Sequence, residues 1–141
     1  MPRNAVRIEL KLEGFDHFER YLEKTIPNGI SAAATEALKE TALEAKAIAK
    51  TLVAVDTGSL QKSIRLERLA RQRGKIYYTG IRAGGYIINP KTGRFVDYAR
   101  FQEYGTSKSR PRPYMRPALR RAMRKLPGRY WRALEGRIAT R

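Results

Sequence analysis

The sequence predicts an α+β domain in which a small antiparallel sheet packs on one long alanine-rich helix. Three patterns indicate this architecture: an alternating apolar segment near the N-terminus, a long stripe of small apolar residues after it, and two extended segments further on. The chain has 141 residues, about the length of one domain, and its 42% of apolar residues suffice for one compact core.

The first third of the chain is expected to contain a strand and two helices. Residues 5–13 alternate between apolar and charged side chains, which is typical of a half-buried strand. A short helix is expected over 15–22 and a longer one over 30–53, whose alanines indicate close approach to a sheet or to another helix. The apolar stripe of the longer helix comprises Ile30, Ala34, Ala37, Leu38, Thr41, Ala45, Ile48 and Leu52.

The middle of the chain predicts a pair of antiparallel strands. Residues 56–59 stop the long helix and cap a single helical turn through Ser63. The extended segment that follows turns at Gly74 and pairs with residues 75–81, which are rich in aromatic and β-branched side chains. The glycines and the Asn-Pro step of residues 82–94 indicate a long loop or an irregular hairpin.

The last part of the chain predicts helices joined by a proline-rich extended segment. Residues 98–104 have helical spacing, and Pro117 serves as the first residue of a basic helix that is interrupted at 127–128. We therefore divide the chain into an α+β core domain, 1–110, and a basic C-terminal arm, 111–141, which packs on the core or projects from it.

The positive charge is concentrated in the second part of the chain. Thirty Lys and Arg residues against thirteen Asp and Glu residues leave a net charge of +17. Residues 1–55 are balanced, so residues 56–141 carry the whole excess. Such an excess indicates an anionic partner, either a nucleic acid or an acidic protein neighbour.

The composition excludes several functional classes. The chain has no cysteine and a single histidine, His17, which excludes disulfides, thiolate chemistry and multi-histidine metal centres. No apolar run reaches the roughly 18 residues that span a bilayer, and no secretory signal is visible. We therefore expect a soluble, cytoplasmic chain with no cofactor, no metal and no membrane partner.

One string suggests an enzyme. Residues 55–59, Val-Asp-Thr-Gly-Ser, are similar to the active-site loop of aspartic proteases, and one copy would suffice in a homodimer. The string follows a helix instead of a strand, however, and no flap-like segment comes after it. We therefore interpret Asp56 as a helix stop and N-cap, and expect a structural ion pair for Glu103, an acid in a basic neighbourhood. No catalytic residue is predicted.

The basic arm interleaves cations with aromatic residues. This pattern suits phosphate contact with base stacking, and it equally suits a protein interface anchored by Tyr, Trp and Arg. Protein docking is the favoured interpretation, because the apolar side chains of the arm exceed what a phosphate-tracking tail requires; these are Tyr114, Met115, Leu119, Met123, Leu126 and Trp131. The candidate contacts to a partner or to DNA are Arg110, Arg112, Arg120, Arg121, Arg124, Lys125, Arg129, Trp131 and Arg132.

Three motifs in fixed order carry a family resemblance. Residues 56–64 read D-T-G-x-L-x-x-S-I, residues 98–106 read Y-A-x-x-x-E-Y-G-T, and residues 113–119 read P-Y-M-R-P-A-L. Over residues 5–125 this order resembles the HK97 gp10-like proteins of tailed phages, from which the very basic tail departs. The family positions in this sequence are Asp56, Thr57, Gly58, Leu60, Ser63, Tyr98, Glu103, Gly105, Thr106, Pro113, Arg116 and Pro117.

The resemblance implies a structural virion protein without enzymatic activity. Such a protein is a ring subunit of the neck, or a tail-completion protein, that joins the tail to the head of a phage or prophage particle. Its partners would be copies of itself, head-connector proteins and tail-terminator or tail-tube proteins, with contact to packaged DNA left open. It would reside in the virion, and in the host cytoplasm during assembly.

The family motifs read as packing and turn geometry. Gly105 is expected at a left-handed helix cap, and a buried cluster is expected to tie the second motif to the core. That cluster comprises Tyr98, Phe101, Tyr104, Tyr114 and Leu119. The alternative function is a stand-alone basic nucleic-acid-binding protein, and a homodimeric aspartic protease is a distant third.

Overall fold

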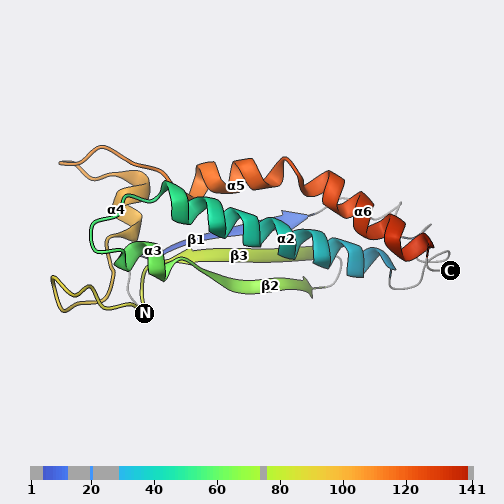
Figure 1. The fold of residues 1–141 in the computed structure, drawn as a ribbon, viewed down its shortest axis with the longest axis horizontal. Coiled ribbons are helices and arrows are strands. Elements are labelled where there is room, and N and C mark those ends of the chain that lie inside the picture. Colours follow the sequence, from blue (N-terminus) through green and yellow to red (C-terminus); the bar gives the residue numbers. More distant parts are fainter. Residues whose placement is uncertain (1–4, 13–19, 21–28, 74–75, 140–141) are drawn as a thin grey trace.

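A three-stranded sheet lies beneath one long helix, and two further helices run along that helix on its other side (Figure 1). The computed structural model describes residues 5–12, 20, 29–73 and 76–139. This arrangement confirms the expected α+β class. The elements are β1 Val6–Leu12, α2 Gly29–Leu52, α3 Ser59–Ser63, β2 Arg65–Arg73, β3 Ile76–Ala83, α4 Ala99–Tyr104, α5 Met115–Met123 and α6 Leu126–Ala139.

The sheet has the strand order β1-β3-β2, and both pairings are antiparallel. The register of β1 on β3 is regular from Val6 opposite Ala83 to Leu12 opposite Tyr77. The side chains of Val6 and Leu10 are buried, and the charged residues between them lie on the opposite face, as the alternation predicts. β2 pairs less regularly, with two shifts of register between residues 66 and 71.

Helix α2 is the central element because it is covered on two sides. It contacts β2 and β3 on one side and α5 and α6 on the other. Its buried residues are mostly alanines, which let both neighbours approach closely because their side chains are short. Two core clusters result, one around Val53, Ile81 and Met115 and the other around Leu38 and Leu134.

The arm forms two helices that pack along α2. The break between them lies at 124–125, whereas the sequence predicts it at Pro127-Gly128. Pro127 is instead the second residue of α6, where its missing N–H costs nothing because the first turn of a helix leaves its N–H groups unpaired. For the same reason α5 begins at Met115 and holds Pro117 within its first turn.

The segment between β3 and α4 is an irregular hairpin. Gly85 N donates a hydrogen bond to Val96 O at 2.9 Å, and Asn89 N donates to Arg94 O at 2.8 Å. Ile88 and Phe95 form an isolated antiparallel bridge between these bonds. The expected helix over 15–22, the turn at Gly74 and His17 lie outside the described residues.

Candidate functional site

The first motif is a packing device that positions the hairpin. Leu60, Ser63 and Ile64 are buried. The Ser63 hydroxyl donates to Leu60 O at 2.6 Å and accepts the backbone N–H of Gly84 at 2.8 Å, so one side chain joins α3 to the start of the hairpin. Gly84 has φ +86° and lies against the Val96 carbonyl, where a Cβ atom would come within 3.0 Å.

Asp56 does not cap a helix, contrary to the expectation. The N-cap of α3 is Gly58, with φ 74° and no side-chain hydrogen bond. Thr57 stabilises the local turn instead. Its hydroxyl donates to Ser59 Oγ at 2.8 Å and accepts the backbone N–H of Ser59 at 3.3 Å. The Asp56 carboxylate lies on the surface, 2.5 Å from Lys91 Nζ of the hairpin. It therefore links the first motif to the hairpin a second time.

The second motif carries a buried carboxylate whose partners are backbone groups. Glu103 is 2% exposed and accepts the N–H groups of Tyr114, Met115 and Arg116 at 2.8, 2.9 and 3.0 Å. These three N–H groups belong to the start of α5, which leaves them unpaired and carries partial positive charge. The expected ion pair of Glu103 is thus replaced by capping of a helix eleven to thirteen residues later.

Tyr114 and Gly105 complete this junction between α4 and α5. The Tyr114 side chain is fully buried, and its hydroxyl donates to Ala99 O at 3.3 Å. Burial raises the pKa of the Tyr114 phenol, and the negative charge of Glu103 raises it further. Gly105 has a positive φ of 74°, as expected, but its ψ of −178° is extended instead of helical. A Cβ atom there would lie 2.7 Å from Ser109 O, so this position admits only glycine.

The loop after Gly105 is a tight turn built by the threonine of the motif. Thr106 N donates to Ser109 O at 2.9 Å, and Thr106 Oγ1 accepts the N–H of Lys108 at 3.2 Å. Arg112 N then donates to Gln102 O at 2.7 Å, which returns the chain to α4. Arg110 and Arg112 are held exposed on this loop.

The buried aromatic cluster is smaller than the sequence predicts. Phe101 is 44% and Tyr104 46% exposed, so neither ties α4 to the core. Helical spacing does not distinguish the buried side of a six-residue helix from its exposed side, and Ala99 and Glu103 occupy the buried side here. The Arg116 guanidinium lies over the Tyr104 ring, 4.7 Å from its centroid.

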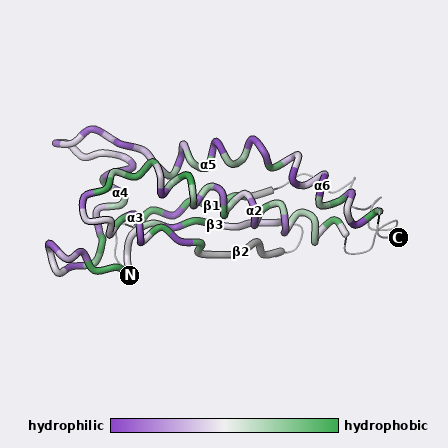
Figure 2. The backbone as a smooth tube through the Cα atoms, in the orientation of Figure 1, coloured by the Kyte–Doolittle hydropathy of each residue, from purple (hydrophilic) through white to green (hydrophobic). Residues whose placement is uncertain are grey.

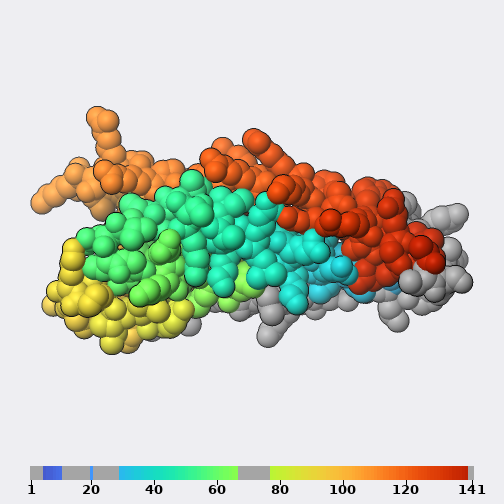
Figure 3. Space-filling model, in the orientation of Figure 1, coloured from blue at the N-terminus to red at the C-terminus, as the bar shows by residue number. Residues whose placement is uncertain are grey.

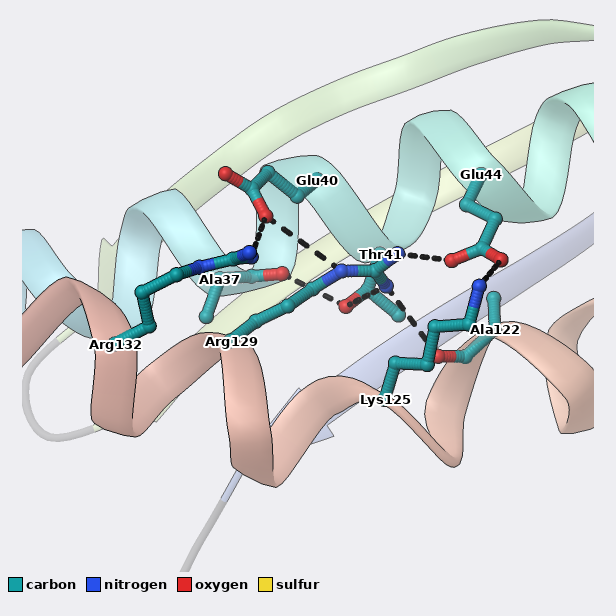
Figure 4. A network of polar contacts seen from close by, with 8 residues as sticks. All are labelled: Ala37, Glu40, Thr41, Glu44, Ala122, Lys125, Arg129 and Arg132. Atoms are coloured by element: carbon teal, nitrogen blue, oxygen red, sulfur yellow. Dashed lines mark hydrogen bonds and ion pairs between the residues drawn. The ribbon is translucent and has the colours of Figure 1, made fainter.

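The basic residues of α6 are engaged by glutamates of α2 (Figure 4). Arg129, whose side chain is 13% exposed, pairs with Glu44 and lies 3.5 Å from Glu40, and it donates to the Thr41 hydroxyl at 3.1 Å. Lys125 reaches Glu44 at 2.6 Å and completes this group. Two further pairs extend the row along the helix: Arg132 with Glu40 at 3.1 Å, and Arg137 with Glu36 at 2.7 Å.

The arginines of α5 have no such partners. Within the described part of the chain, none of them forms an ion pair, and all are exposed. Figure 2 shows hydrophilic residues on the turns of α5 that face away from α2. A groove of about 350 Å³ separates α5 from the proline-rich segment before it, and Arg116 and Arg120 line it. The arginines concerned are Arg116, Arg120 and Arg121 of α5 and Arg124, which directly follows it.

The described side chains include no group of His, Asp and Glu residues that could hold a metal ion. None of the described helices is long and apolar enough to cross a membrane.

The comparisons with known proteins give one match. The model of the family described as "Bacteriophage HK97-gp10, putative tail-component" matches residues 16–105, which is more than half of the chain. The chain belongs to this family. Comparison with curated proteins and with solved structures gives no match.

Membership of the HK97-gp10-like family confirms the family resemblance predicted from the sequence. The family is one of structural tail components, so this is a structural phage protein whose partners are other phage proteins. The match includes the first motif and the second as far as Gly105, and it ends before the third. Glu103 therefore lies inside the matched region, whereas the three N–H groups that it accepts lie beyond it.

Proposed function

We propose that this HK97-gp10-like protein is a subunit of a ring at the head–tail junction, where it joins the tail to the head and carries out no reaction. Family membership supports the assignment to the virion. The polar groups of its motifs support a non-catalytic role, because Ser63, Glu103 and Thr106 are each engaged in hydrogen bonds that shape the chain itself.

One surface feature supports assembly with copies of the same chain. Ile88 and Phe95 face each other across the hairpin between two backbone hydrogen bonds, so they form a non-hydrogen-bonded pair whose side chains lie close together on one face. They are 57% and 54% exposed. The hairpin lies at one end of the elongated molecule, the end that also holds α4 (Figures 1 and 3).

An exposed apolar pair on a peripheral hairpin is suited to insert into a neighbouring subunit. Burial of this exposed apolar pair against a neighbouring subunit would provide a hydrophobic driving force for association. Tyr86 of the same hairpin and Val55, which follows α2, are also exposed.

The test uses a double variant, Ile88→Ser with Phe95→Ser. We expect it to fold with an unchanged thermal midpoint and to lose assembly, measured by light scattering and by the yield of particles with joined heads and tails. Ile138→Ser is the matched control, since Ile138 is 49% exposed but lies on α6, away from the hairpin. Normal joining by the double variant would contradict the proposal.

A further inference from the structure

We infer that the outer side of α5, together with the loop before it, binds the phosphate backbone of duplex DNA without reading its sequence. The surface concerned is called the arginine surface below and comprises Arg110, Arg112, Arg116, Arg120, Arg121 and Arg124. The inference rests on the proposed function, because the junction between head and tail is where a tail protein meets the packaged genome.

The first step of the argument is that the charge of this surface is uncompensated. The basic residues of α6 pair with Glu36, Glu40 and Glu44 of α2, whereas no ion pair involves the arginine surface within the described residues. Arg116 contacts the Tyr104 ring, which leaves its charge intact. Closely spaced positive charges on one helix repel each other, so an anionic partner is favoured.

The second step argues against a further copy of the chain as that partner, from the charges of the described residues. Among the described acidic side chains, only Asp97 and Glu135 are exposed and without an ion pair. The chain carries a net charge of +17, so each further copy placed beside this surface increases the total positive charge and the repulsion between copies. The net charge therefore favours a partner that brings negative charge from outside the ring.

The third step distinguishes a nucleic acid from an acidic protein. The sequence favours protein docking because of the apolar residues of the arm, but the structure buries Tyr114 and Met115 and packs Leu119 and Leu126 against the core. Trp131 is exposed, but it lies on α6, outside the arginine surface. Of the apolar side chains on α5, Met123 alone is exposed among those the structure describes. Protein interfaces depend on buried apolar and aromatic anchors, whereas phosphate contacts need only cations.

The fourth step concerns geometry. Arg116, Arg120 and Arg124 are four residues apart and lie in a row on one side of α5, and Arg121 flanks them. The nine residues of α5 extend over about 13 Å, a length that corresponds to roughly four phosphates of one DNA strand. A rigid row of cations at this spacing suits the regular phosphate backbone of a duplex.

The test measures binding of the full chain to a fluorescent 25-base-pair duplex of random sequence across a salt series. We expect the logarithm of the binding constant to fall with the logarithm of salt concentration by about 0.9 per phosphate neutralised. Replacing Arg120, Arg121 and Arg124 by Gln should reduce that slope by two to three and weaken binding at least tenfold at low salt.

The matched control removes the same charge elsewhere, with Lys39→Gln, Lys62→Gln and Arg94→Gln, all exposed residues of α2, α3 and the hairpin. The control should retain the salt slope and most of the affinity. Equal losses in both triple variants would show general attraction by net charge and would overturn the inference.

The same variants separate this inference from the proposed function. If the variant of α5 assembles rings normally but loses DNA, both stand. If it retains DNA binding but fails to join heads to tails, the arginine surface docks on a protein and the inference is wrong. The double variant Ile88→Ser with Phe95→Ser should instead retain DNA binding while losing assembly. If one of the two proposals fails, the other can therefore still be tested.

Discussion

Helices α5 and α6 are both rich in arginine, but their charges are used in opposite ways. Both lie along α2 (Figure 1). α6 directs its basic side chains toward the glutamates of α2, while α5 packs through Met115, Ala118 and Ala122 and directs its arginines outward. A basic segment therefore presents a basic surface only where the helix that it packs against offers no acidic partners.

The difference arises from the position of the acids on α2. Glu36, Glu40 and Glu44 recur every four residues and form one row, which faces α6 and the turn before it. α5 lies beyond the end of that row and is attached instead through Glu103, whose carboxylate accepts three N–H groups at its N-terminus. One helix is held by side-chain charges and the other by a cap.

The largest expected effect tests the cap. Glu103→Ala leaves three backbone N–H groups of α5 buried without an acceptor, so it should lower the free energy of unfolding by about 3 kcal/mol or more. Glu103→Gln, which retains one acceptor oxygen, should cost less. Urea denaturation measures both. If Glu103→Ala has the stability of wild type, the cap does not hold α5.

The second test compares the stability lost on truncating a buried side chain of α6 with that lost on truncating an exposed aromatic one. Leu134 is 1% exposed, and Leu134→Ala should cost about 2–5 kcal/mol because it leaves a cavity between α6 and α2. Trp131 is 50% exposed and contacts Tyr130 edge-on, so Trp131→Ala should cost less than about 1.5 kcal/mol. A reversed order in thermal melts would contradict the placement of α6.

The third test concerns the ion pairs of α6. Glu44→Gln should lower the free energy of unfolding by about 1–2 kcal/mol, because Arg129 is largely buried and loses its closest acceptor. The loss should leave α5 unaffected, which amide hydrogen exchange can resolve helix by helix. Equal loss of protection in α5 and α6 would show that the two helices are not held independently.

The same carboxylate predicts a pH dependence. Hydrogen bonds from Lys125 and then from Arg129 lower the pKa of Glu44 below its ordinary value of 4.5. Its contribution to stability is therefore complete above pH 4.5 and is lost as the pH falls through the lowered pKa. Wild type should lose more stability than Glu44→Gln over that acid range, as measured by melts at matched ionic strength. Parallel curves would contradict the pairing.

The smallest expected effect is on the outer side of α5. Replacing Arg120, Arg121 and Arg124 by Gln should change the free energy of unfolding by no more than about 0.5 kcal/mol, because none of them has an ion pair among the described residues. Arg129→Gln, with a single charge removed, should cost more. Calorimetry of the two variants compares the helices directly.

Local patterns predicted most of the elements. The alternation of residues 5–13 and the alanine stripe of 30–53 correspond to β1 and α2, because burial of one face imposes a period that can be read from the residues themselves. The family motifs predicted that Gly105 has a positive φ and that Tyr114 is buried. The burial of Phe101 was predicted wrongly, since a helix of six residues offers too few positions to define a face.

What the sequence by itself determined is the set of elements, the family and the location of the positive charge along the chain. Only the tertiary structure decided which charges remain available. The N–H groups that donate to Glu103 lie eleven or more residues further along the chain, and Glu44 meets Lys125 and Arg129 more than eighty residues away. Such pairings depend on which helix faces are brought together in packing, and no local period of the sequence records that choice.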